Sequence, residues 1–209
     1  MKGLFSKKKL WNFFLSYSWI WALTSLVLCF GLAYSVHAIN DFKDFETFTY
    51  FFETYEDKGE EWGQFTQKAC PEILKVDVYD VSPNEIGKTE RFAAFGSYAD
   101  CLILLESDLS EMREVIQSEL HPYSEEEQSI FQTAVPLEAY SCYGKTFAFK
   151  VHDGSDPSYN ANYRFEEFFD FGSKEESFYL CSSSSSVHFG EKTDYGCRIL
   201  SAILQEMSR

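Results

Sequence analysis

The chain has 209 residues and a formal charge of −15 at pH 7, with 18 Lys and Arg residues against 33 Asp and Glu residues. Hydrophobic residues make up 45% and aromatic residues 18%, which excludes an intrinsically disordered chain. The acidic excess repels phosphate groups and argues against a general nucleic-acid-binding protein. The length allows one domain with an anchor, but not two full domains.

The first forty residues differ from the rest in charge. They contain four Lys residues and no acidic residue, a charge of +4, whereas residues 41–209 hold the other 14 basic residues and all 33 acidic ones, a charge of −19. No charged residue lies between Lys9 and Asp41, and this apolar stretch is long enough to cross a bilayer as a helix. Because basic residues stay on the cytoplasmic side, the pattern predicts a cytoplasmic tail (1–9), a transmembrane helix or signal anchor contacting the lipid bilayer (10–38) and an acidic extracytoplasmic domain (41–209).

A cleaved signal peptide is the alternative for this N-terminal segment. Val36-His37-Ala38 has the small residues that signal peptidase accepts, which would release a secreted protein after Ala38. The apolar stretch is longer than the ~7–15 residues of an ordinary signal-peptide core, which favours the anchor.

The cysteines of the exported domain permit disulfides without specifying them. Cys101 lies within an apolar run and is expected to be a small buried side chain. The other four could form two bridges in any of three pairings, or stay free: Cys70, Cys142, Cys181 and Cys197.

The first half of the domain alternates between predicted strands and helices. Strands are expected at Thr47–Tyr55, which is aromatic and β-branched, at 74–79, which alternates, and at Cys101–Leu105, which is apolar throughout as in a parallel sheet. A short helix is expected within Gln64–Pro71 and a longer one over Glu85–Tyr98.

The second half predicts hairpin strands and a final helix. Ser107 or Asp108 is expected to cap a helix running to Leu120, and Ser124-x-x-Glu127 is a capping box that begins a short helix. The remaining expected elements are strands at Ala139–Tyr143, Thr146–His152 and Ser177–Ser182, a loop over Asp153–Asn162 and a helix capped by Asp194. The fold class is therefore α/β: one compact domain with a mixed sheet, a βαβαβ start, hairpin strands and a C-terminal helix.

Residues 45–140 resemble the first lobe of type II solute-binding proteins of ABC transporters. The resemblance rests on the strand–helix order, on Lys75–Asp80 as a second strand, and on Tyr98-Ala99-Asp100 before the apolar strand. It implies a truncated periplasmic-binding-protein-like domain with a ligand cleft at the strand ends. The chain departs from the family in having no complete second lobe and a membrane anchor in place of a lipoprotein cysteine.

A ligand site is predicted beyond the carboxyl ends of the parallel strands. Ligands of open α/β sheets bind there, which points to Tyr55, Glu106, Ser107 and Asp108. The simpler interpretation is that Ser107 and Asp108 only cap a helix while Glu106 is solvated.

Other motifs do not identify a reaction. Glu53, Glu56, Asp57, Glu60 and Glu61 form an acidic patch without a calcium-loop pattern. The four His residues lack zinc spacing, and no glycine-rich phosphate loop is present. Neither the Ser182–Ser186 tract beside His188 nor Cys142 with His152 specifies a nucleophile. No cofactor, metal or catalytic residue is therefore assigned.

The function expected is that of a single-pass, membrane-anchored extracytoplasmic binding or interaction protein. Its partners would be a solute, a membrane transporter or another envelope protein, and nucleic acid is not among them. A cell-envelope hydrolase, with a site assembled from scattered residues, is the alternative from a different class.

Overall fold

The structure is a computed structural model, and it describes residues 12, 16, 20, 23–31, 46–57, 62–131, 136–172, 175–190 and 194–208. The chain divides into two units, Met1–Lys43 and Asp44–Arg209. Residues 23–31 of the first unit are helical. The predicted transmembrane segment 10–38 lies largely outside the described residues, and among those described no helix has the length and apolar composition needed to cross a membrane.

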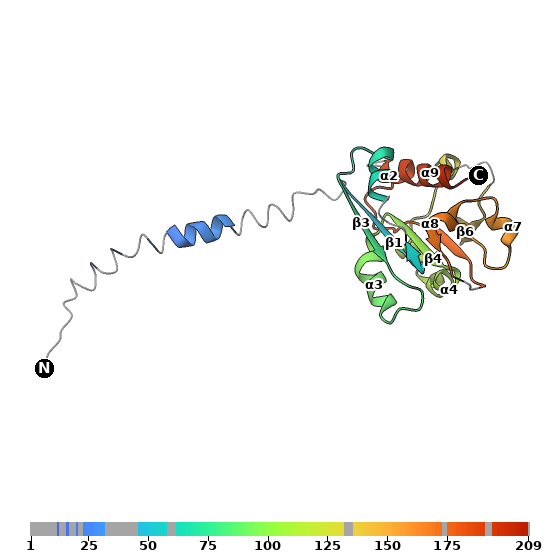
Figure 1. The fold of residues 1–209 in the computed structure, drawn as a ribbon, viewed down its shortest axis with the longest axis horizontal. Helices are drawn as coiled ribbons and strands as arrows, with labels where there is room; N and C mark the ends of the chain where they lie inside the picture. The colour runs from blue at the N-terminus through green and yellow to red at the C-terminus, as the bar shows by residue number, and fades with distance from the viewer. Residues whose placement is uncertain are drawn as a thin grey trace. The chain divides into compact units, whose positions relative to one another are not determined.

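A six-stranded mixed sheet forms the centre of the second unit (Figure 1), in the order β3-β1-β4-β8-β6-β5. Strands β3, β1 and β4 are parallel to one another, and the other three pairings are antiparallel. The strand bounds are β1 Thr47–Phe52, β3 Lys75–Asp80, β4 Cys101–Leu105, β5 Ala139–Cys142, β6 Lys145–His152 and β8 Phe178–Cys181. The predicted α/β class, with its βαβαβ start and C-terminal helix, is confirmed.

Helices cover both faces of this sheet. Helices α2 (Trp62–Ala69) and α9 (Tyr195–Met207) lie on one face, and α3 (Lys88–Phe95) and α4 (Glu106–Glu111) lie on the other (Figure 1). Successive side chains of β1 alternate between the two: Phe48, Tyr50 and Phe52 join the core under α2 and α9, and Phe51 joins the core under α3 and α4. Since each face is covered, both sides of β4 are buried, which explains why this strand is an uninterrupted apolar run.

The helix expected after β4 differs from the prediction. It breaks into α4, a 3-10 turn η4 (Met112–Glu114) and α5 (Ile116–Glu119). Its N-cap is Leu105, with no side-chain capping bond, so the expectation that Ser107 or Asp108 caps it is wrong. The chain passes from strand to helix without a turn, because the amide of Glu106 is already bonded to the carbonyl oxygen of Ser177 at 3.0 Å.

Other predicted helix starts are confirmed. Ser124 and Glu127 form the capping box of α6 (Glu125–Ile130). Asp194 is the N-cap residue of α9, although its side chain makes no capping bond.

Several short elements have no counterpart in the sequence-based expectations. They are α7 (Pro157–Asn160), which lies in the expected loop, α8 (Phe165–Phe168) and a two-stranded sheet of β2 (Glu56–Asp57) and β7 (Phe169–Asp170). The helix expected over Glu85–Tyr98 is instead divided into α3 and the 3-10 turn η3 (Gly96–Tyr98). Elements of two to four residues are too short to leave a periodic pattern, and tertiary contacts hold them.

Candidate functional site

The larger candidate site is a hollow of about 380 Å³ on the α3 face of the sheet, a volume in the range of small-molecule sites. Parallel pairing places Thr49 opposite Asp77 and Phe51 opposite Tyr79. Period-two alternation therefore turns side chains from both strands to the same face. The residues that line the hollow are Thr47, Thr49, Asp77, Tyr79, Tyr98, Asp100, Ser185 and Val187.

Asp100 fixes one wall of this hollow. Its carboxylate accepts hydrogen bonds from the backbone amide of Thr49 at 2.7 Å and from the Ser186 hydroxyl at 2.5 Å, and it contacts Nδ1 of His188 at 2.8 Å. Asp100 is 3% exposed and His188 fully buried. A buried carboxyl group needs several hydrogen-bond donors. The bonds made by Asp100, which directly precedes β4, connect this position to β1 and to the loop after β8.

The serine tract forms the neighbouring wall. Ser183 donates its hydroxyl to the carbonyl oxygen of Ser97 in η3, and Ser184 donates to the carbonyl oxygen of Ser118 in α5. Ser182 pairs with the Tyr123 hydroxyl at 2.8 Å. The tract therefore binds three segments of the domain together, and Ser185 is left lining the hollow.

The serine and histidine near Asp100 do not form a nucleophilic triad. In such a triad the imidazole lies between the serine and the carboxylate. Here Ser186 and His188 contact the same carboxylate oxygen, so the serine proton is directed to Asp100. This arrangement holds a loop in place rather than activating a hydroxyl.

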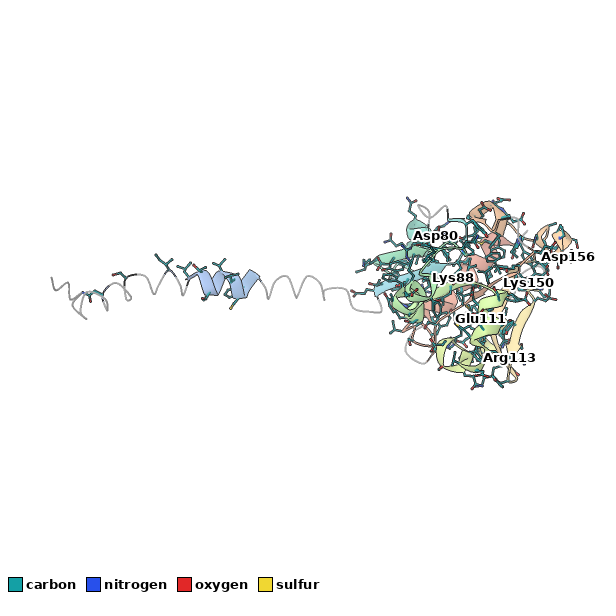
Figure 2. All side chains as sticks on the ribbon, turned by 90° about the horizontal axis from the view of Figure 1, so that it is seen from below. Asp80, Lys88, Glu111, Arg113, Lys150 and Asp156 are labelled. Carbon is teal, nitrogen blue, oxygen red and sulfur yellow. The ribbon has the colours of Figure 1, made fainter. Side chains whose placement is uncertain are left out.

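A second, smaller hollow of about 100 Å³ lies at the carboxyl ends of β1 and β4 on the same face. Three ionisable side chains meet there: Nζ of Lys88 is 2.8 Å from both carboxylate oxygens of Asp108 and 4.0 Å from Oε1 of Glu53. Lys88 belongs to α3 and Glu111, another lining residue, to α4, and both are labelled in Figure 2.

Glu53 is the buried member of this second site. It is 2% exposed, and its Oε2 accepts a long hydrogen bond of 3.4 Å from the amide of Leu105. Burial and the neighbouring Asp108 carboxyl raise the pKa of Glu53 to about 8, against the opposing effect of Lys88. Glu53 is therefore mostly protonated at pH 7.

The predicted site residues are only partly brought together. Asp108 lines the second hollow, whereas Glu106 and Ser107 are exposed and do not line it. Tyr55 is half-buried, and its hydroxyl accepts a hydrogen bond from the Asn84 amide at 3.2 Å. The expectation that ligands bind beyond the carboxyl ends of parallel strands therefore points to the region of the smaller hollow, but of the four predicted residues only Asp108 lines it.

The sequence prediction missed Glu53 and Lys88 as site residues. It places Glu53 in a solvated acidic patch, two members of which, Glu60 and Glu61, lie outside the described residues. The position of Glu53 in the period-two series Thr47, Thr49, Phe51 was the signal that it faces inward.

All six cysteines lie in described parts of the chain, and each is a free thiol. The five in the second unit are buried, as expected for Cys101. In the same described ranges, no group of three or more His, Cys, Asp or Glu side chains is arranged to hold a metal ion.

A scan against protein-family models, a search of curated proteins and a search of solved structures each return no match to this chain.

Proposed function

We propose that residues 44–209 form an extracytoplasmic ligand-binding domain, held to the membrane by the segment 10–38, that binds a small polar molecule in the larger hollow. The observation that carries this proposal is the hollow itself: about 380 Å³, with polar side chains converging from β1, β3, η3 and the serine tract. Ligand pockets combine such a volume with a few polar groups held by rigid elements.

The side chains that line this hollow favour a particular ligand chemistry. Asp77 and Asp100 supply carboxylates, and the Thr, Tyr and Ser residues supply hydroxyls. Among the described residues, those lining the hollow include no Lys or Arg, and the one nearby ammonium, Nζ of Lys75, already donates to the Asp77 carboxylate at 2.7 Å. Because two carboxyl groups line the hollow and this one cation is engaged, an anionic ligand is disfavoured. Tyr98 and Tyr79, one face of which is covered by Phe95, add aromatic rings, and such rings attract cations. We infer a neutral polyol or an amine-bearing compound as the ligand.

The proposed membrane setting rests on the charge distribution of the sequence. A +4 tail and a −19 domain flank an uncharged apolar span, which is the pattern of an N-terminus that stays inside. The resemblance of residues 45–140 to solute-binding proteins supports the further proposal that this domain associates with a solute transporter. Adjacent permease and ATPase genes, and co-purification with their products, would support that association.

The binding proposal is tested by a thermal-shift panel on the full-length chain in detergent. We expect stabilisation by members of the polyol or amine sets, and none by phosphates or dicarboxylates. A ligand at a hundredfold excess over its Kd stabilises by about 2.7 kcal/mol. Asp77→Asn should raise the Kd of the ligand at least tenfold. Asp194→Asn is the matched control, because the Asp194 side chain is 73% exposed and does not line the hollow.

Responses confined to anions, or a response of Asp77→Asn equal to the wild type, would contradict this ligand class.

A hydrolase remains the second candidate, and the Glu53–Asp108 pair favours it. A neutral carboxyl beside a carboxylate has the protonation states of a general acid and base. The second hollow, of about 100 Å³, admits only a few atoms, which is why binding in the larger hollow is preferred. Turnover of p-nitrophenyl esters or glycosides that is lost in Glu53→Gln would reverse this preference.

A further inference from the structure

Helix α3 borders both hollows. Its first residue, Lys88, and its middle residue, Phe92, line the smaller hollow. Its last residue, Phe95, stacks on Tyr79 of the larger hollow, with ring centroids 4.2 Å apart and planes 15° apart. The helix then runs directly into η3, which ends at Tyr98, another lining residue of the larger hollow.

Helix α3 packs less tightly than its neighbours. The structure describes all eight of its residues, and none of them is buried. By contrast, Leu109 anchors α4 in the core with no exposed surface. At the N-terminus of α3 stands Gly87, with φ of 90°, a conformation that other residues rarely adopt. Few buried contacts mean a low free energy of local opening.

Lys88 ties the N-terminus of α3 to the rest of the domain. Burial by itself lowers the pKa of Lys88, but its hydrogen bond to Asp108 and the charges of Glu53, Asp108 and Glu111 leave that pKa raised. The ammonium therefore stays charged and holds Asp108 across the hollow. This ion pair is partly buried, with both side chains about 20% exposed.

Glu53 lies beneath this ion pair. The groups that line the hollow with it are Lys88 from α3 and Asp108 and Glu111 from α4. The buried Cys181 thiol of β8, whose pKa is raised by burial and by the charge of Glu53, lies outside this lining. While Glu53 keeps its proton, one ammonium faces one carboxylate. Once the proton leaves, two adjacent carboxylates share that ammonium, and the buried one lacks solvation.

An ionised Glu53 is stabilised by any movement that admits water. The strands around it are fixed by their ladders, and α4 is anchored by Leu109. The remaining cover is α3. The other end of α3 is held, because Ser183 donates its hydroxyl to the carbonyl oxygen of Ser97 in η3, which follows α3 directly.

We propose that the Glu53–Asp108–Lys88 cluster is a proton-dependent latch on helix α3, and that loss of the Glu53 proton releases the N-terminal end of α3 from the smaller hollow. This latch does not rest on the proposed ligand site, because it is defined by the three side chains and the helix they hold.

Hydrogen exchange of the full-length chain in detergent tests the latch without any ligand. We compare protection factors of the α3 amides, corrected for intrinsic exchange rates, at pH 6.5 and pH 9.0. In the wild type they should fall by about tenfold or more, because the closed state holds the Glu53 proton more tightly than an open state up to the folded pKa of about 8, and the loss levels off above that pH. In Glu53→Gln, which keeps the shape and the hydrogen bonds without the titration, they should not fall. Amides of α9 on the opposite face are the internal control and should be unchanged.

Two outcomes would overturn the latch: no loss of α3 protection in the wild type, or an equal loss in Glu53→Gln. Asp108→Asn provides an independent arm, because removing the second carboxylate should move the midpoint down by at least one pH unit. An unmoved midpoint would show that Asp108 does not raise the pKa of Glu53 and would overturn the latch.

A failed ligand screen would count against the proposed function alone, since this measurement uses no ligand.

Discussion

Asp100 and Glu53 are two equally buried carboxyl groups on one face of one sheet, 3% and 2% exposed, that are treated in opposite ways. Asp100, at the amino end, receives contacts from a backbone amide, a hydroxyl and an imidazole, all within 2.8 Å. Glu53, at the carboxyl end, receives one amide at 3.4 Å and faces another carboxyl group. The two groups therefore differ in the donors around them and not in their burial, and at Glu53, which has few donors, burial and the Asp108 carboxyl group raise the pKa.

The largest effect is expected from neutralising Asp100. Asp100→Asn replaces one accepting carboxylate oxygen with an amide NH2 group. Its hydrogens would then point at groups that donate to Asp100 in the wild type. We expect a loss of about 3 kcal/mol in the free energy of unfolding at pH 7, within the range for breaking a buried charged network. Urea denaturation followed by circular dichroism measures it, with Asp194→Asn as the exposed control.

A loss below about 1 kcal/mol would mean that Asp100 is not the anchor of the serine tract.

The equivalent substitution at the carboxyl end of the sheet, Glu53→Gln, should raise the free energy of unfolding instead of lowering it. The pKa of Glu53 is about 8 in the folded chain against an ordinary value of 4.5, so the folded state binds the proton more tightly between these pH values. Wild-type stability therefore falls as pH rises through this window and levels off above it. Glu53→Gln removes the fall.

We expect Glu53→Gln to equal the wild type below pH 4.5 and to exceed it by on the order of 2 kcal/mol at pH 8. This figure is a conservative fraction of the full linkage energy, which is about 1.4 kcal/mol for each pH unit between the folded and unfolded pKa values. Denaturation curves at pH 4.5, 6 and 8 decide this. A constant difference across the three pH values would show that Glu53 does not titrate in this range.

The smallest effect is expected from removing one of the Asp100 donors. Ser186→Ala takes one hydroxyl from the carboxylate and should cost about 1 kcal/mol. Ser185→Ala, in the same tract but exposed, is the control and should stay within about 0.5 kcal/mol. Equal losses in the free energy of unfolding for the two substitutions would show that the Ser186 hydroxyl does not stabilise the fold through Asp100.

The order of elements could be predicted well from the sequence, because that order follows from local patterns. The apolar run Cys101–Leu105 is β4 to the residue, and Ser124 with Glu127 is a capping box. The site was harder to predict, because it is assembled across the chain. Asp100 meets His188 over 88 positions, and Glu53 meets Leu105 over 52. The prediction of Ser107 or Asp108 as a cap is wrong because it applies a local rule where a strand leads directly into a helix.

Strand β8 has a consequence for how the domain forms. It lies between β4 and β6 and pairs Leu102 with Cys181, so the middle of the sheet waits for a segment near the C-terminus. Until β8 arrives, β3-β1-β4 and β6-β5 are separate ribbons with open edges. Pairing of strands so far apart in sequence is slow, because the entropy cost of closing the intervening loop comes before the stabilising contacts form. A nascent chain therefore keeps the edges of β4 and β6 open until β8 has been synthesised, and these open edges are prone to aggregation during that interval.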